Sequence, residues 1–178
     1  MVKGIREIEL KVLSELMKNS RVSDRELAKR LGVSQPTVSR IRNKFEKEGY
    51  IKEYTYIPDF VKLGYNLMAL TFIKRAEWGS RKEDGLLFKE ANRHATKTGF
   101  DTVMAVRGMG CGYDAVILSF HENYSAFLER LREIKQFPQI DVEQINSFIV
   151  DLNDKGLYRQ LTFSTLASHM LTLRKPPE

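Results

Sequence analysis

Cysteine is almost absent from this sequence, since Cys111 is the single one among 178 residues. One thiol cannot form an internal disulfide, and it excludes zinc sites that need several cysteines. No apolar run approaches the roughly 20 residues that a membrane span needs. The first ten residues, MVKGIREIEL, carry charges where a signal peptide needs an apolar block. We therefore expect a soluble, cytoplasmic protein with room for one ordinary domain or two small ones.

Histidine is also scarce, and its three copies do not cluster. His94, His121 and His169 lie far apart in the sequence, so they predict no metal site. The glycine-rich run GMGCG at residues 108–112 differs from a dinucleotide-binding turn, because a strand pattern rather than a helix pattern follows it. We expect neither a metal nor a cofactor.

The net charge of +6 is confined to one part of the chain. Residues 18–47 contain nine Lys or Arg and three acidic residues, an excess that equals the net charge of the whole chain. The remaining residues therefore sum to zero. A basic patch of this kind is typical of a surface that binds a polyanion.

Apolar spacing predicts three helices in the first 50 residues. The first has an apolar residue every third or fourth position. Its members are Ile5, Ile8, Val12, Leu13 and Leu16. Ser23 and Glu26 have the spacing of a capping box that begins the second helix, and Gly32 is placed to end it. Ser34 can cap the third helix, whose inward stripe is Val38, Ile41 and Phe45.

Two helices joined by a tight turn in a basic stretch predict a helix-turn-helix, whose second helix enters the DNA major groove. With the apolar stripe inward, the opposite face of that helix carries polar groups that suit base edges, such as Arg40 and Asn43. Other basic groups suit phosphates. The predicted DNA-binding residues are Arg21, Ser34, Gln35, Pro36, Thr37, Ser39, Arg40, Asn43, Lys44, Lys47 and Lys52.

After Gly49 the hydrophobic period changes from that of a helix to that of a strand. Residues 50–57 alternate like a strand, and Pro58 ends the pattern. The following segments predict a βαββαβ order, which is that of a ferredoxin-like domain. They are 65–75 (strand), 82–97 (helix), 100–107 (strand), 113–121 (strand), 123–136 (helix) and 140–152 (strand). Residues 153–178 form a tail in which 157–171 can be helical.

The sequence resembles the Lrp/AsnC family of transcription regulators over residues 1–152. The resemblance rests on SDRELAKRLGVS (23–34), TVSR (37–40), EGYIK (48–52) and Tyr113-Asp114. It implies an α+β chain, with a winged helix-turn-helix over 1–60, a βαββαβ effector and oligomerisation domain over 61–152, and an extension over 153–178. It also implies a sequence-specific, double-stranded DNA-binding regulator that forms homodimers, which often assemble further into tetramers or octamers.

The resemblance also implies a small-molecule effector, typically an amino acid, near the turn before the third strand of the second domain. The residues that would bind it are Gly108, Gly110, Gly112, Tyr113 and Asp114. Asp114 has an alternative role, because an Asp beside a glycine-rich turn often caps local amides. Cys111 stands where the family usually has glycine, and the chain continues 26 residues past the last predicted strand. Leu157, Leu161 and Met170 could dock that tail on an interface or over the effector pocket.

Other functions stay open at this point. The helices could form a bundle with a solvated basic face, or the protein could compact DNA with little sequence preference. A third alternative is an enzyme similar to sirohaem decarboxylases, which share the two-domain shape. That chemistry needs a histidine near the turn before the third strand, where this chain has RGMGC at 107–111. We therefore expect a regulator and not an enzyme.

Overall fold

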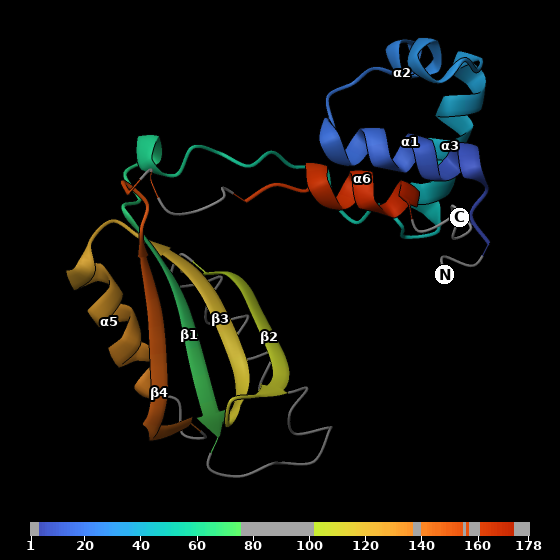
Figure 1. The fold of residues 1–178 in the computed structure, drawn as a ribbon. Helices are drawn as coiled ribbons and strands as arrows, with labels where there is room; N and C mark the ends of the chain where they lie inside the picture. Colours follow the sequence, from blue (N-terminus) through green and yellow to red (C-terminus); the bar gives the residue numbers. More distant parts are fainter. Residues whose placement is uncertain (1–3, 76–101, 137–139, 155, 157–160, 173–178) are drawn as a thin grey trace. The chain divides into compact units, whose positions relative to one another are not determined.

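The computed structural model describes residues 4–75, 102–136, 140–154, 156 and 161–172. The chain divides into two compact units (Figure 1). The first combines residues 1–57 with 159–178, and the second contains 58–158. The chain therefore leaves the first unit after Ile57 and returns to it at Arg159.

The first unit contains the three predicted helices, α1 (Glu7–Lys18), α2 (Asp24–Leu31) and α3 (Gln35–Lys47). Ser23 caps α2 by accepting a hydrogen bond from the Glu26 backbone N–H, and Ser34 caps α3 in the same way. The Glu26 carboxylate takes a different partner from the one that a capping box predicts, because it accepts from Arg30. Gly32 ends α2 with φ +67°, a left-handed conformation that glycine adopts without steric cost.

The core of this unit lies between these helices and a fourth, α6 (Ser164–Thr172). Its fully buried side chains include the predicted Val12, Val38, Ile41 and Phe45. The predicted tail helix over 157–171 is confirmed from Ser164 onward, while 157–160 lie outside the described residues. Met170 of α6 packs with Leu171 against the core of the helices, whereas Leu161 is exposed. Figure 1 shows α6 beside α1.

The predicted strand over 50–57 is wrong, because this segment is irregular. No strand of the described residues pairs with it, so it lacks a backbone ladder. It is held instead by the helices, since the Ile51 N–H donates to the Phe45 carbonyl oxygen and the Ser20 hydroxyl donates to that of Thr55. Of residues 50–57 only Ile51 is half-buried, and it packs against the core of the helices.

The second unit is a four-stranded antiparallel sheet with the order β2-β3-β1-β4. Its elements are β1 (Leu67–Arg75), β2 (Thr102–Gly110), β3 (Tyr113–His121), α5 (Tyr124–Lys135) and β4 (Ile140–Asp151). A short 3₁₀ helix, Val61–Leu63, precedes β1. These elements confirm the predicted strands and the predicted helix over 123–136, while the predicted helix over 82–97 lies outside the described residues.

The two faces of the sheet differ in how they are covered. One face carries Ala69, Thr71 and Ile73 of β1, which are buried. Helix α5 packs on this side, where the Phe127 ring lies edge-on to the buried His121 ring at 5.5 Å. The opposite face contains Phe120 and a set of mostly apolar side chains that no described helix covers. They are Leu70, Phe72, Val116, Leu118, Met104, Val106 and Phe148.

Candidate nucleic-acid interface

Helix α3 has one buried side and one polar, exposed side. Val38, Ile41 and Phe45 are almost completely buried, which fixes the rotation of the helix about its axis. The predicted contact residues lie on the other side or at the first turn. Gln35, Pro36, Arg40, Asn43 and Lys47 are exposed, as is Ser34, while Thr37 and Ser39 are half-buried. The structure therefore presents an arginine and an asparagine that suit base edges.

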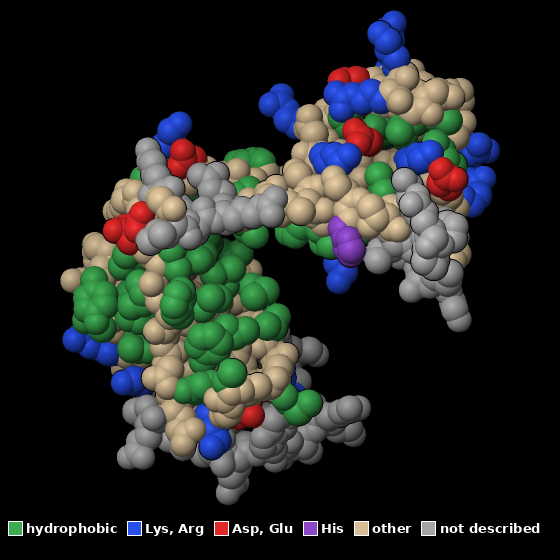
Figure 2. All heavy atoms as spheres, in the orientation of Figure 1, with side chains coloured by type: hydrophobic (Ala, Val, Ile, Leu, Met, Phe, Trp, Pro, Cys, Tyr) green, Lys and Arg blue, Asp and Glu red, His purple; other side chains and the backbone are tan. Residues whose placement is uncertain are grey.

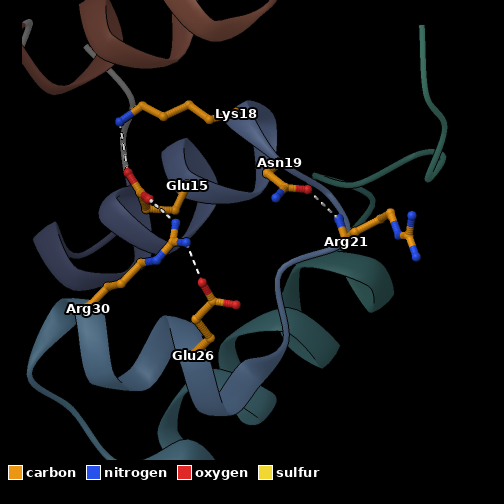
Figure 3. A network of polar contacts seen from close by, with 6 residues as sticks. All are labelled: Glu15, Lys18, Asn19, Arg21, Glu26 and Arg30. Atoms are coloured by element: carbon orange, nitrogen blue, oxygen red, sulfur yellow. Dashed lines mark hydrogen bonds and ion pairs between the residues drawn. The ribbon is translucent and has the colours of Figure 1, made fainter. Parts of the chain in front are cut away.

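Four of the nine basic residues in 18–47 are used within the fold. Lys18 pairs with Glu15 at 2.8 Å, and Arg30 reaches both Glu15 and Glu26 (Figure 3). The contact between Arg30 and Glu15 joins α2 to α1. The hydrogen bond from Lys18 lowers the pKa of Glu15 against the opposing effect of burial, and Arg30 adds to this lowering.

Arg42 joins α2, α3 and the segment that follows them. Its Nε donates to the Asp24 carboxylate at 2.7 Å, and its Nη2 donates to the Val22 carbonyl oxygen at 3.1 Å. Its guanidinium lies 5.9 Å from the centre of the Tyr54 ring, within the range of a cation–π contact. The Tyr54 hydroxyl donates to Glu46 of α3 at 2.6 Å. Arg42 thus holds the geometry of the helix pair.

Lys44 lies on the Glu9 carboxylate of α1, with 3.1 Å between Nζ and Oε1. Glu9 is only 1% exposed and also accepts hydrogen bonds from the side chain and backbone of Arg6. Burial raises the pKa of Glu9, but the hydrogen bonds from Arg6 and Lys44 outweigh it and lower the pKa to about 2. Lys44, which we predicted to contact phosphate, is thus engaged by a buried acid.

The other five basic residues of this stretch have no ion pair with any residue that the structure describes. They are Arg21, Arg25, Lys29, Arg40 and Lys47, and Lys52 shares this property. All six are exposed. Sequence reasoning missed Arg25 and Lys29, although their four-residue spacing on α2, away from Leu27 and Ala28, places them on one exposed face. Figure 2 shows Lys and Arg side chains over this unit.

The glycine-rich run lies at the hairpin between β2 and β3. Gly108 and Gly110 belong to β2, so the turn itself consists of Cys111 and Gly112, and the expectation that all three glycines lie between the strands is wrong. Gly110 and Tyr113 pair across the turn, and φ is +52° at Cys111 and +81° at Gly112. Positive φ at both central residues is characteristic of a type I′ turn, which needs only two residues.

Tyr113 and Asp114, the other two predicted effector residues, begin β3 and are half-buried. The Tyr113 ring lies 5.7 Å from that of Phe72 on β1, and its hydroxyl is hydrogen-bonded to the Asn146 side chain of β4. The described residues contain no group of three acidic, His or Cys side chains placed to bind a metal. None of the described helices is long and apolar enough to span a membrane.

The sequence is similar to that of known DNA-binding proteins. Residues 5–52 match a family model for winged helix-turn-helix DNA-binding domains. An HTH-type transcriptional regulator of Pyrococcus abyssi is 29% identical over 145 residues, which cover 81% of this chain and 90% of that protein. The leucine-responsive regulatory protein of Rhizobium meliloti is 36% identical over 66 residues, which are 37% of this chain and 42% of that protein.

Solved structures share the fold over about nine-tenths of this chain. Escherichia coli AsnC superposes with a TM-score of 0.65 at 20% identity, covering 88% of this chain and 97% of its own. A transcriptional regulator of Neisseria meningitidis, solved as a complex with L-Met, gives a TM-score of 0.68 at 17% identity, with 91% and 99% covered. The α+β architecture of a helix-turn-helix followed by an antiparallel sheet is therefore common to these proteins.

Proposed function

Since the chain belongs to the Lrp/AsnC family of HTH-type transcriptional regulators, we propose that it regulates transcription by binding specific double-stranded DNA sites through α3. In this proposal α3 enters the major groove and presents Arg40 and Asn43 to base edges. The exposed cations Arg21, Lys47 and Lys52 contact phosphates and set the register.

The observation that carries this proposal is that some basic residues form ion pairs within the fold, whereas others on the exposed side of α3 do not. If the basic residues served only solubility, we would expect no spatial separation between those with ion pairs and those without. Here Arg30, Arg42 and Lys44 make ion pairs between helices, whereas Arg40 and Lys47 lie on the polar side of α3 without an ion pair among the described residues. Uncompensated charge on the exposed side of a helix is what a phosphate backbone attracts.

We further propose that the uncovered sheet face binds a second copy of the same chain. Phe148 is 61% exposed there, and Met104 and Val106 are each about 40% exposed. A continuous apolar face on an antiparallel sheet favours burial against another apolar layer. Figure 2 shows hydrophobic side chains gathered over the strands. A sheet packed on its own copy about a two-fold axis is self-complementary, which suits paired DNA half-sites.

We also propose that a small effector binds beside the turn between β2 and β3. The structural relative from Neisseria meningitidis carries L-Met. In this chain the half-buried Tyr113 and Asp114, next to the Cys111–Gly112 turn, are the groups that we expect to bind an amino acid. Their polar atoms lie at the start of β3, where Asn146 adds a hydrogen-bonding amide.

The experiment that tests the function is fluorescence-anisotropy binding to a duplex from the protein's own promoter, near physiological salt, with excess scrambled DNA as competitor. Binding that survives the competitor supports a specific regulator. If the competitor removes it, binding should next be sought among genomic fragments. A steep salt dependence with no preference for any fragment would replace the proposal with the alternative of a DNA compactor of low specificity.

A further inference from the structure

The C-terminal helix α6 belongs to the same compact unit as the three N-terminal helices. One side of α6 lies on α1, as Figure 1 shows. The buried Ser14 hydroxyl of α1 donates a hydrogen bond to the Ala167 carbonyl oxygen at 2.9 Å, and Ala167 itself is fully buried. Leu171, one turn further along, packs on the core of the helices. The contact with α1 therefore determines which side of α6 faces outward.

Next to this contact, α6 carries an apolar stripe that is largely exposed. Phe163 immediately precedes the helix, and Leu166 and Met170 follow it at steps of three and four residues, the spacing of one helical stripe. Phe163 and Leu166 are each 50% exposed, whereas Met170 is half-buried. We call these three residues the α6 flank. The apolar side of α6 is therefore wider than its contact with α1.

Helix α6 also lacks charge, in contrast to the rest of its unit. Its sequence, STLASHMLT, contains no Lys, Arg, Asp or Glu, whereas each of the other described α-helices contains several. In a chain with 29% charged residues, residues 161–172 contain none. Helices that are exposed on one side normally carry charged or polar residues there, and an apolar flank beside the buried side is typical of a helix that is covered twice.

The distribution of charge indicates what covers the α6 flank. A polyanion is a poor occupant, because the flank offers it no cation. The unit has its positive excess in residues 18–47, so two copies of it repel each other where their basic sides approach. At the α6 flank no like charges oppose the approach of a second copy. An uncharged apolar stripe on an otherwise basic unit thus favours contact with its own copy.

We propose that the α6 flank binds the α6 flank of a second copy of the chain. The contact is isologous, because a two-fold axis beside Leu166 places Phe163 of each copy next to Met170 of the other. It joins two helical units directly and is separate from the contact that we propose for the sheet face. It requires neither DNA nor an effector, so it does not rest on the proposed function.

The first test is disulfide formation in the full chain carrying Cys111→Ser, which removes its single thiol. Leu166→Cys then places a thiol on the α6 flank. Ser168→Cys is the matched control, because it is also exposed but points to the opposite side of the helix. A disulfide needs two Cα atoms within about 7 Å, so under a mild oxidant Leu166→Cys should form covalent dimers at least about tenfold faster than Ser168→Cys.

The oxidation is carried out at a concentration at which sedimentation velocity shows the parent assembled. Equal rates for the two variants, no covalent dimer from Leu166→Cys, or a parent that stays monomeric would each overturn the proposal. Maleimide labelling of the reduced thiols identifies the reason. Without dimers, slow labelling at position 166 would show that another part of the same chain covers the flank, and fast labelling would show that nothing does.

The second test uses charge and does not depend on thiol chemistry. Leu166→Glu places like charges on both sides of the contact, and Ser168→Glu adds the same charge outside it. Because Leu166 is half exposed, Leu166→Glu should keep the fold, which circular dichroism checks. In sedimentation velocity, Leu166→Glu should need at least about tenfold more protein than the parent for half-assembly.

Ser168→Glu should stay within about twofold of the parent, as a surface substitution outside the contact. The same change in both glutamate variants, or none in Leu166→Glu, would overturn the proposal. Phe148→Asp alters the sheet face alone, so failure of that contact is distinguishable from failure of the contact through α6.

Discussion

Lys44 of α3 donates a hydrogen bond at 3.1 Å to Glu9 of α1, so a lysine in the DNA-binding helix neutralises a carboxylate in the core. Lys47, three residues later on the same helix, is exposed and has no ion pair among the described residues. Lys44 and Lys47, which look equivalent in the sequence, thus have different roles. One stabilises the fold, and the other is available to a phosphate.

Exchanging each lysine for glutamine separates these tasks. Lys47→Gln should weaken binding to all DNA sequences and reduce the slope of log affinity against log salt by about 0.9, because one phosphate contact is lost. Lys44→Gln should lower the melting temperature, because Glu9 loses one of its charged partners. Anisotropy titrations at several salt concentrations and thermal unfolding measure both. A stable Lys44→Gln variant with a reduced salt slope would assign Lys44 to DNA.

The Glu9 carboxyl makes the helical unit sensitive to acid. Its pKa is about 2 in the folded chain and near 4.5 when it is unperturbed, so the unfolded chain binds more protons between these values. The stabilisation is complete above pH 4.5 and is lost as the pH falls toward 2. It amounts to something on the order of 3 kcal/mol. Denaturation followed by circular dichroism at each pH should show it.

The control for this acid sensitivity is another glutamate of the same helix. Glu9→Gln should destabilise the protein at pH 7 and approach the parent's stability near pH 2. Glu7 pairs with Lys11 on the surface, where Glu7 is 75% exposed, so Glu7→Gln should change stability by less than about 0.5 kcal/mol. The account of Glu9 would be wrong if both variants lost the same stability at pH 7.

Cys111 occupies a left-handed backbone position that disfavours most side chains. Its φ of +52° lies in the region that asparagine adopts more readily. Cys111→Asn should therefore stabilise the sheet unit by about 1 kcal/mol, and Cys111→Val should destabilise it because valine is β-branched. Cys111→Ser controls for loss of the thiol. Chemical denaturation of the three variants decides the matter, and a destabilised Cys111→Asn would show that the thiol makes a contact of its own.

The uncovered sheet face should control self-association. Phe148→Asp places a charge on the β4 side of that face, at its most exposed apolar ring, and should shift the protein toward monomers in sedimentation velocity. Tyr124→Asp removes an exposed aromatic ring from α5 and should leave the assembly unchanged. Unaltered assembly in Phe148→Asp would locate the interface elsewhere.

Much of this fold could be predicted because local signals agree with the tertiary structure. Ser23, Gly32 and Ser34 define the helix ends, and the stripe of Val38 and Phe45 gives the rotation of α3. The sequence predicted a tail helix with Met170 as a docking residue, but not where it docks, because no local pattern in Ser14 or Ala167 indicates a partner 153 residues away. Segment 50–57 alternates in the way that predicts a strand, but no strand of the described residues pairs with it.

The sequence predicted which residues of α3 face outward, but not which basic residues are neutralised by ion pairs. Helical periodicity places Arg40 and Asn43 outward, and the structure puts them on the exposed side of α3. Periodicity cannot tell which cations are neutralised, since the partners of Arg42 and Lys44 lie on other helices. For the same reason Arg25 and Lys29 of α2 were not identified. Pairing between elements is decided by tertiary packing, which a single sequence does not reveal.

The most direct test of the central claim is the specificity of Arg40→Ala. Affinities of the parent and the variant are measured by anisotropy for the preferred duplex and for scrambled DNA at one salt concentration. If Arg40 reads a base, the variant should lose about 1–3 kcal/mol on the preferred duplex and much less on scrambled DNA, so the ratio of the two affinities falls. An unchanged ratio would contradict base recognition by Arg40.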